Sequence, residues 1–451
     1  MRLTAAFFTL GLGSIVLVKW SRVRLIISIL TAEGLFATLR ERLQIGPAPP
    51  TSSGPEPART RALWHDYAGA LHIHSTYSDG VGTVEQIAQA ANKAGLDYMV
   101  LCDHSNLAPL VNHQDGWHGK TLVLAGTEIT TDNGHLLALN VPPSFVPAPG
   151  NASQAQEAIR AIGGIGFIAL PCDLKDHWRN FALHQPGIGL EVFNLSAIAR
   201  TKISLPGLLL VWLRYNSRRK LHAFHLVAAR PVRELALWDR LMLPLDPHGP
   251  SRPVVGIASL DAHAVMRFGG RSYPYPTYEE SFRTLRTHIV TAKPLSRSPL
   301  HAREDARLVH SALAQGHCFM AYDNYADSRG FRFEAVPMAD ALGAHMGDAL
   351  TLVSENAHVR LEIQAPSANS LVRLFHNGVV VAAARGGFLS FQARAAGAYR
   401  VEVYLYRFHI GDLCFGAKPW IFSNPLYLQP APVPAEPHLQ VAPAPAHSRS
   451  A

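Results

Sequence analysis

Residues 71–79 read Leu-His-Ile-His-Ser-Thr-Tyr-Ser-Asp. An extended chain points alternate side chains to opposite faces, so His72 and His74 would lie on the same face of one strand. Two imidazoles on one face at a strand end can bind one metal ion, and Asp79 follows after a short loop. The stretch therefore predicts a strand whose far end supplies metal ligands.

Short apolar runs with similar side chains at one end recur along the chain. They cover residues 97–104, 121–128, 135–141 and 254–263. The side chains at their ends are Asp103, His104, Glu128, Asp261 and His263, with His135 at the start of its own run. Short apolar runs bounded by turns are typical of strands buried on both faces, as in a parallel sheet.

Helical segments separate several of these runs. Thr83 and Gln86 have the spacing of a capping box before residues 84–94, and Gly95 is placed to end that helix. A second capping pattern begins at Ser153. Alternating strands and helices predict an α/β domain of the βα-barrel kind, in which functional residues gather at the carboxyl ends of the strands.

The ligand types limit the metals that such a site would bind. Imidazole nitrogens and carboxylate oxygens, with no cysteine clearly among them, suit Zn, Mn or Fe. A carboxylate such as Glu128 can bridge two ions. Two ions roughly 3.5–4 Å apart could hold a hydroxide and bind the oxygens of a substrate.

On these residues the chain resembles the PHP-domain metallohydrolases, the polymerase and histidinol phosphatase superfamily, over roughly residues 66–290. The resemblance implies a distorted βα barrel of the seven-stranded type that binds two or three divalent metal ions. It also implies the ligands of each site: His72, His74, Glu128 and Asp261 for the first, Glu128 and His135 for the second, and Asp79, His104 and His263 for the third.

One position departs from the family pattern. The family usually has a histidine before a proline at the end of a later strand, where this chain has Leu170 before Pro171. Leucine cannot bind a metal, so the second site would lack one ligand. Cys172, Asp173 and His177 are the nearby residues that could replace it.

The resemblance implies a metal-dependent phosphoesterase, of the nucleoside-bisphosphate phosphatase or 5′-3′ exonuclease type, that uses a metal-bound hydroxide. Its expected catalytic residues are Asp261, Glu128 and Asp103, the last through orienting a histidine ligand, and its expected phosphate-binding residues are Arg267, Arg271 and Lys175. A carbamate or carboxylic ester hydrolase is the second hypothesis, because residues 418–427 are similar to the end of hydrolases related to carbaryl hydrolase. A non-catalytic, membrane-tethered binding protein is the third.

At 451 residues the chain has room for two or three domains. Residues 331–430 alternate like strands, with the hairpin signal Asn377-Gly378, and predict a small antiparallel β-sandwich after the barrel. The expected order is an apolar membrane-associating segment at 1–44, a linker at 45–65, the barrel at 66–325 with an insertion near 201–245, the β-sandwich at 326–429, and a disordered Pro/Ala tail at 430–451.

The N-terminal segment is apolar in two blocks with a basic cluster at Lys19, Arg22 and Arg24 between them. A signal anchor or shallow membrane insertion is expected, with a helix packed on the protein as the alternative. The basic cluster favours a cytoplasmic catalytic domain, and export through this segment is the other possibility.

Composition adds few constraints on partners. A net charge of +8 is compatible with a small anionic substrate, including a nucleotide or single-stranded oligonucleotide. The chain has no dense basic run typical of a reader of duplex nucleic acid. Its 4 cysteines have no paired spacing, so no disulfide framework is expected.

Overall fold

The structure is a computed structural model. It describes residues 64–146, 150–202, 228–244, 249–268, 270–336, 343–354, 357–410 and 413–430, with the short pieces 211, 215 and 223–225. The expected N-terminal membrane segment, the linker up to residue 63, much of the insertion and the tail after residue 430 lie outside the described residues. Within the described ranges, no helix is long and apolar enough to cross a membrane.

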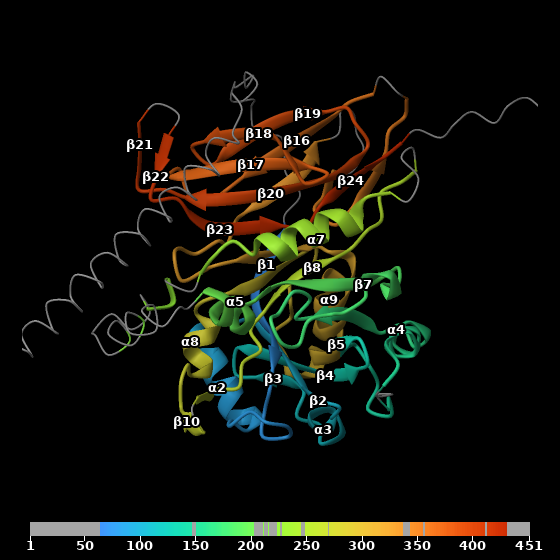
Figure 1. The fold of residues 1–451 in the computed structure, drawn as a ribbon, viewed down its shortest axis with the longest axis vertical. Helices are drawn as coiled ribbons and strands as arrows, with labels where there is room; N and C mark the ends of the chain where they lie inside the picture. The colour runs from blue at the N-terminus through green and yellow to red at the C-terminus, as the bar shows by residue number, and fades with distance from the viewer. Residues whose placement is uncertain are drawn as a thin grey trace, which may run out of the picture.

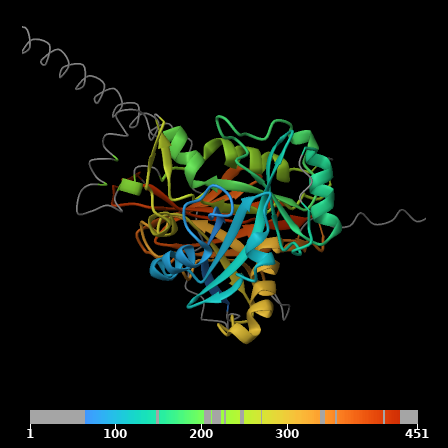
Figure 2. The same ribbon diagram turned by 90° about the horizontal axis from the view of Figure 1, so that it is seen from below.

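The N-terminal part alternates strands and helices, as the sequence predicts. Its strands are β1 (His65–Ile73), β2 (Tyr98–His104), β3 (Gly116–His118), β4 (Thr121–Thr131), β5 (Gly134–Leu139), β6 (Ile165–Ala169), β7 (Ile188–Asn194), β8 (Gly256–Ser259), β9 (Met266–Phe268), β10 (Arg271–Tyr273), β11 (Arg286–Thr291) and β12 (Cys318–Ala321). Its helices are α2 (Val84–Ala94), α3 (Ala108–Val111), α4 (Ala152–Ala161), α5 (Leu195–Lys202), α7 (Val232–Met242), α8 (Tyr278–Phe282) and α9 (Ala302–Gln315), with 3-10 turns η1 (Phe181–Leu183) and η3 (Pro299–His301). Several of these helices lie around the outside of the strands (Figure 2).

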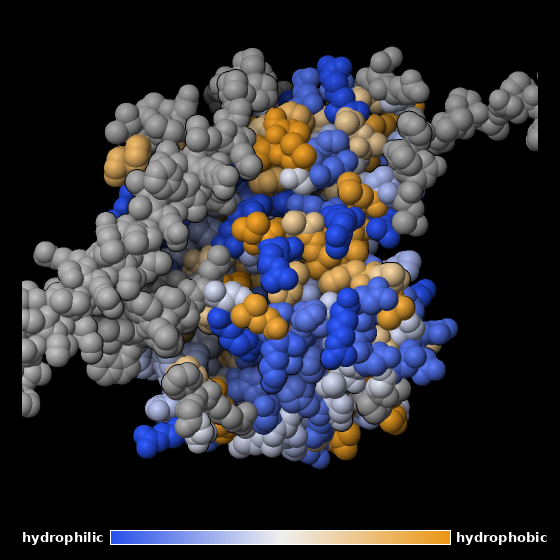
Figure 3. Space-filling model, in the orientation of Figure 1, coloured by the Kyte–Doolittle hydropathy of each residue, from blue (hydrophilic) through white to orange (hydrophobic). Residues whose placement is uncertain are grey.

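The C-terminal part consists of strands. They are β13 (Arg332–Val336), β14 (Ala344–His345), β15 (Ala349–Thr351), β16 (Val359–Gln364), β17 (Ser370–His376), β18 (Val379–Arg385), β19 (Phe388–Ala393), β20 (Gly397–Leu405), β21 (Phe408–Ile410), β22 (Leu413–Phe415), β23 (Lys418–Ser423) and β24 (Leu426–Gln429). In Figure 1 these strands form the upper part of the molecule, above the N-terminal strands and helices. The lower part of the face drawn in Figure 3 is mostly hydrophilic.

One large mixed sheet runs through both parts. Its main order is β15-β24-β20-β23-β12-β11-β1-β2-β4-β5-β6-β7-β8. The pairs β1/β2, β2/β4, β6/β7 and β7/β8 are parallel, whereas β5 is antiparallel to both β4 and β6. The fold is therefore α/β, with a mixed rather than a parallel sheet.

A four-stranded sheet, β14-β13-β16-β19, faces the C-terminal end of the large sheet. Side chains of both sheets, among them Phe333, Leu361, Val401 and Trp420, are buried in one apolar core. The burial of these apolar surfaces is the main force that stabilises this part of the chain.

Local sequence signals can be compared with the structure directly. Thr83 caps α2 in a capping box, and Gly95 ends it with a φ of 74°, which confirms both predictions. Asn377 and Gly378 join β17 to β18 with positive φ values, as the hairpin signal predicts. The capping prediction at Ser153 is wrong: Asn151 caps α4, because its side chain accepts a hydrogen bond from the Gln154 backbone.

A buried charge cluster joins β1 and β11 to the segment after β12. The His288 imidazole lies 2.8 Å from Asp66 and 3.0 Å from Asp323 and is fully buried. Arg286 lies 3.2 Å from Asp323, and Arg332 lies 3.9 Å from Asp66. Burial lowers the pKa of His288, but the two carboxylates outweigh it and raise the pKa to about 9.

We expect His288→Gln to lower the free energy of unfolding by about 3 kcal/mol near pH 6, because it removes the buried cation that lies between the Asp66 and Asp323 carboxylates and leaves them to Arg332 and Arg286. The folded-state pKa lies above the unfolded value of about 6.5, so this stabilisation is fully present below pH 6.5 and is lost as the pH rises through 9. Urea unfolding of both proteins between pH 6 and 9 measures it. A difference that stays constant across this range would contradict the assignment.

Candidate metal centre

The end of β1 pairs with the chain that follows β8. The Leu260 amide donates to the Leu71 carbonyl at 3.0 Å, and the Ala262 amide donates to the His72 carbonyl at 3.2 Å. The His74 amide donates to the Ala262 carbonyl at 3.0 Å. These bonds place His72, in β1, and His74, just after it, beside Asp261 and His263, although nearly 190 residues separate the two segments.

The backbone at this edge takes unusual conformations. His72, Leu170 and Asp261 have φ values of 60°, 50° and 51°, in the left-handed region that residues with a side chain rarely adopt. Such residues cluster at functional sites, where the surrounding structure compensates their strain. At His72 the pairing of β1 with β2 also shifts register, between Ala70 and Ile73.

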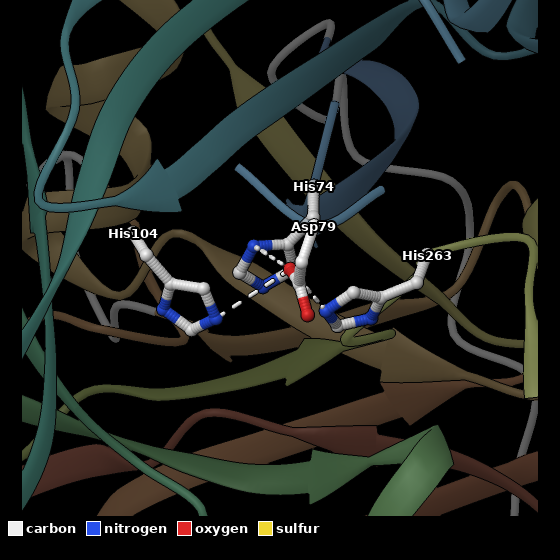
Figure 4. A group of neighbouring side chains, drawn as sticks. All are labelled: His74, Asp79, His104 and His263. Carbon is white, nitrogen blue, oxygen red and sulfur yellow. Dashed lines mark ion pairs between the residues drawn. The ribbon is translucent and has the colours of Figure 1, made fainter. Parts of the chain in front are cut away.

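One group of side chains gathers around Asp79 (Figure 4). Its Oδ1 lies 2.9 Å from His263 Nε2, 3.6 Å from His104 Nε2 and 3.7 Å from His74 Nδ1. The ligand atoms of these four residues lie within 4.8 Å of one another. The group joins the loop after β1, the end of β2 and the segment after β8.

A second group consists of His72, His74 and Asp261, again within 4.8 Å. Asp261 Oδ1 lies 3.5 Å from His74 Nε2 and 3.9 Å from His72 Nε2. His74 therefore belongs to both groups, with one ring nitrogen toward each. The family resemblance implied that it served only the first site.

Glu128, at the end of the apolar run in β4, contacts the histidines of both groups. Its Oε2 lies 3.0 Å from His104 Nδ1, 3.3 Å from His72 Nε2 and 3.5 Å from His74 Nε2, and its Oε1 lies 3.3 Å from His135 Nδ1. His135 begins β5 rather than ending a strand. It reaches the same edge because β5 runs antiparallel to β4, and its Cα pairs with that of Thr130.

His74 and Glu128 are held in the forms that bind metals, whereas His72 is not: burial lowers the pKa of His72, but the Glu191 and Glu128 carboxylates outweigh it and raise the pKa well above its usual value. Burial lowers the pKa of His74, so its imidazole is held neutral, the form that binds metals. Burial raises the pKa of Glu128, but His72 and His104 outweigh it and hold the pKa well below the usual range of a carboxyl. Glu128 is therefore a carboxylate inside the protein.

The donor set fits divalent cations. Nε2 of His72 and Nε2 of His74 are buried and have no hydrogen-bond partner among the residues that the structure describes. Buried polar atoms normally have a partner, and both atoms face carboxylate oxygens across gaps of 3.3–3.9 Å. A cation between them would satisfy both kinds of atom.

Asp103 does not contact a histidine directly. It is fully buried, and its oxygens accept hydrogen bonds from the Ser75 amide, the Ser75 hydroxyl and the Ser78 hydroxyl. Ser78 Oγ in turn lies 3.3 Å from His74 Nδ1. Asp103 thus fixes the loop between β1 and Asp79, and it reaches a histidine only through Ser78.

Glu191 was not singled out by the sequence analysis. It lies in β7, is fully buried, and its Oε1 is 2.7 Å from His72 Nδ1. Its Oε2 accepts hydrogen bonds from the Leu170 amide and from Asn194. The signal available in the sequence was a single acidic residue inside the apolar run of residues 188–194.

The residues that could replace the missing histidine lie elsewhere. Leu170 is buried, and Cys172, Asp173 and His177 are in neither group. Asp173 is engaged by Arg200, whose Nε and Nη2 donate to its Oδ1 at 3.1 and 2.9 Å. These three residues therefore do not rebuild the second site.

Arg200, on α5, is a second residue that the sequence analysis missed. Its Nη1 lies 3.7 Å from Asp261 Oδ2, and the side chain is 43% exposed. Asp173 holds the guanidinium in place, so a half-exposed cation lies directly beside a candidate metal ligand.

The three residues expected to bind phosphate are not among the described side chains that the structure brings to the two groups of ligands. Arg267 and Arg271 lie on the hairpin of β9 and β10, where Arg271 is exposed and the side chain of Arg267 is outside the described set. Lys175 is exposed, and its amide donates to Asp173. No described contact joins Arg271 or Lys175 to either group of ligands.

The PHP domain family matches residues 70–196, which run from β1 into α5. The chain carries a PHP domain. Over 44 residues it is 43% identical to the DNA polymerase/3'-5' exonuclease PolX of Bacillus subtilis, a match that covers 10% of this chain and 8% of that protein.

Three solved structures are also similar to this chain, each at 14% sequence identity. A two-domain protein from Bacteroides vulgatus, described as containing a PHP-like metal-dependent phosphoesterase, covers 82% of this chain and 100% of its own, with a TM-score of 0.33. A protein from Bifidobacterium adolescentis described as a metal-dependent phosphoesterase covers 45% and 88%, and an amidohydrolase from Chromobacterium violaceum covers 47% and 92%, both with a TM-score of 0.26.

We expect Glu191→Gln to weaken metal binding about 10-fold, because the buried carboxylate orients the His72 ring from behind. Metal titration followed by calorimetry measures the change. Asp305→Asn is the matched control, since Asp305 is a buried carboxylate on α9 that bonds Ser296 and Trp117 instead. Equal affinity in wild type and Glu191→Gln would contradict the positioning role.

Proposed function

We propose that this PHP protein is a metal-dependent phosphoesterase acting on phosphate esters of nucleotides or short oligonucleotides, of the nucleoside-bisphosphate phosphatase or 5′-3′ exonuclease type. The observation that carries the proposal is the convergence of imidazoles and carboxylates on one strand edge beside the guanidinium of Arg200. Residues that bind metal ions, lying next to a planar guanidinium in a fixed orientation, suit a substrate that carries a phosphoryl group.

The cofactors of the proposal are two or three divalent ions, Mn, Zn or Fe, held by His72, His74, Asp79, His104, Glu128, His135, Asp261 and His263. Such ions supply Lewis-acid polarisation of a phosphoryl oxygen and lower the pKa of water.

The exposure of the ligand side chains indicates the side from which a substrate would reach the ions. His72 and His74 are fully buried, whereas the side chains of Asp79 and His104 are 37% and 39% exposed. Substrate would therefore enter from the side of Asp79 and His104.

Arg200 would bind a non-bridging oxygen of the phosphate. Its Nε and Nη2 donate to Asp173, and its Nη1 donates to Ser196 Oγ at 3.0 Å and lies 3.7 Å from Asp261 Oδ2. Because arginine keeps its charge at all relevant pH values, it would offset the negative charge of the phosphoryl group throughout the reaction. Asp261 and Glu128 would help to orient the attacking water, and Asp103 would hold the loop that carries Asp79.

The proposal includes the architecture around the site. We infer that β1, β2, β4, β5, β6, β7 and β8 form a distorted, closed barrel, with residues 66–325 as its domain, followed by a β-sandwich over residues 326–429. The hydrogen bonds between residues 260–262 and the end of β1 support closure, and the shared core of the two C-terminal sheets supports the sandwich. We also propose that residues 1–44 associate with a membrane and leave the catalytic domain on the cytoplasmic side.

Residues 418–427 do not argue for an ester hydrolase. Trp420 is fully buried and donates a hydrogen bond to the Ala326 carbonyl, and Phe422 is also buried. Their contacts account for them as core residues of the C-terminal sheets.

The purified protein, assayed with Mn²⁺, should hydrolyse 3′,5′-nucleoside bisphosphates or 5′-phosphorylated oligonucleotides. Asp261→Asn should abolish this activity, since it removes a charged ligand at the strand edge. Phosphate release and oligonucleotide shortening are the measurements. Turnover of aryl carbamates with none of phosphate esters would overturn the proposal in favour of an ester hydrolase, and metal binding without turnover of either would favour a binding protein.

Arg200→Ala should lower kcat/KM for these phosphate esters about 100-fold while leaving the bound metal unchanged, because a fixed donor to the transition state is lost. Arg160→Ala is the matched control, since Arg160 is an arginine on the exposed side of α4 that bonds Gln185. If Arg200→Ala behaves like Arg160→Ala, Arg200 has no role in binding phosphate.

A further inference from the structure

A separate cluster of metal-type side chains lies where the N-terminal part meets the C-terminal sheets. His317 lies between α9 and β12, His345 ends β14, and Asp348 follows in the turn before β15. One ligand atom of each residue lies within 4.8 Å of those of the other two. None of the three belongs to the groups around Asp79 and Asp261.

The contacts within this cluster leave one buried atom unexplained. His317 Nε2 lies 2.9 Å from Asp348 Oδ1, and Asp348 Oδ2 accepts a hydrogen bond from the His345 amide at 2.9 Å. His345 is only 4% exposed, yet its Nδ1 has no hydrogen-bond partner among the described residues. A hydrogen bond between their side chains accounts for His317 and Asp348 but not for His345.

His345 is suited to donate a lone pair. Burial lowers its pKa to about 4, so the imidazole is neutral at ordinary pH. Its ring lies 4.2 Å from the ring of His317, centroid to centroid. Two such imidazoles and a carboxylate are a donor set that Zn²⁺ and similar ions bind in proteins.

Two glycines bring the contributing segments together. Gly316 ends α9 with a φ of 73°, and Gly347 has a φ of 97°. A Cβ on Gly347 would lie 2.4 Å from the Gln315 carbonyl oxygen and 2.7 Å from His317 Cδ2, so a side chain there would push the segments apart. The Gly347 amide donates to the Pro425 carbonyl and the Tyr427 amide donates to the Asp348 carbonyl, which holds the turn in place.

A pocket of about 330 Å³ borders the cluster. His317, Gly316, Gly347 and Asp348 line it, together with Asn424 and Tyr427 from the C-terminal sheets. Because His317 and Asp348 border this pocket, an ion that they hold would have a coordination position open to water or a small anion.

We propose that His317, His345 and Asp348 form an additional site for a divalent transition-metal ion, Zn²⁺ being the best match to the donor set. The ion would connect the end of α9 to β14 and the turn after it, and so fasten the C-terminal sheets to the N-terminal part. Because a metal that binds only the folded chain stabilises it, this site would raise thermal stability without taking part in the proposed hydrolysis.

The full chain, loaded with Zn²⁺ and freed of excess ion by gel filtration, tests the proposal by metal analysis. His345→Ala and Asp348→Asn should each bind about one equivalent less Zn²⁺ than wild type. His72→Ala should retain this equivalent and lose metal elsewhere. His301→Ala is the control, since His301 is an exposed histidine at the start of α9.

Thermal unfolding supplies a second readout. Zn²⁺ added to metal-free His72→Ala protein should raise Tm, and the rise should be smaller when Asp348→Asn is also present, because the group around Asp79 does not include His72 and can still bind metal. Asparagine keeps the size of the side chain and can still accept the hydrogen bond from the His345 amide, so loss of fold does not obscure the result. Unchanged Zn²⁺ content in Asp348→Asn, or an equal rise in Tm with and without it, would overturn the site.

Discussion

Backbone hydrogen bonds between the end of β1 and residues 260–262 hold the metal centre together. They join segments that would otherwise have no reason to meet, and they place four of the ligand side chains on one edge of the sheet. The cost of this arrangement is visible at His72 and Asp261, whose backbones are in the left-handed region. Buried carboxylates and imidazoles are unfavourable unless they are paired or bind metals, so a cation bound among them would stabilise the arrangement that these backbone hydrogen bonds create.

Leu170 lies where the family resemblance implies a histidine ligand, and a leucine side chain has no atom that binds a metal. The structure offers no substitute ligand from Cys172, Asp173 or His177. Instead, Asp173 fixes Arg200 beside Asp261. A guanidinium cannot act as a Lewis acid, but it carries a permanent positive charge and donors in fixed directions. A site with fewer metal ligands and one fixed arginine could therefore still neutralise a phosphate.

Many of the candidate ligands could be predicted from the sequence, because the end of a strand is marked by residues that are neighbours in the chain. Continuous apolar runs predicted that Asp103 and Asp261 lie near strand ends, which the structure confirms, whereas Glu128 lies inside β4, which continues to Thr131. Where those strands lie in the sheet was not readable, and the antiparallel direction of β5, which brings His135 to the shared edge, came only with the structure. The cap at Asn151 was missed because Asn and Ser are both good N-cap residues and lie two positions apart.

The residues that sequence reasoning missed act through contacts across the fold. Glu191 contacts His72 across 119 positions of sequence, and Arg200 is aligned by Asp173, which had itself been considered as a ligand. His317, His345 and Asp348 come from separate elements that only the packing of two glycines brings together. No periodic pattern marks such positions, since their chemistry depends on tertiary contacts.

X-ray diffraction from crystals of the full chain grown with Zn²⁺, recorded at the zinc absorption edge, tests the central claim most directly. We predict an anomalous peak among His72, His74 and Asp261, about 2.0–2.2 Å from their ligand atoms. Crystals in which these side chains keep the same arrangement but show no anomalous peak between them would contradict the account.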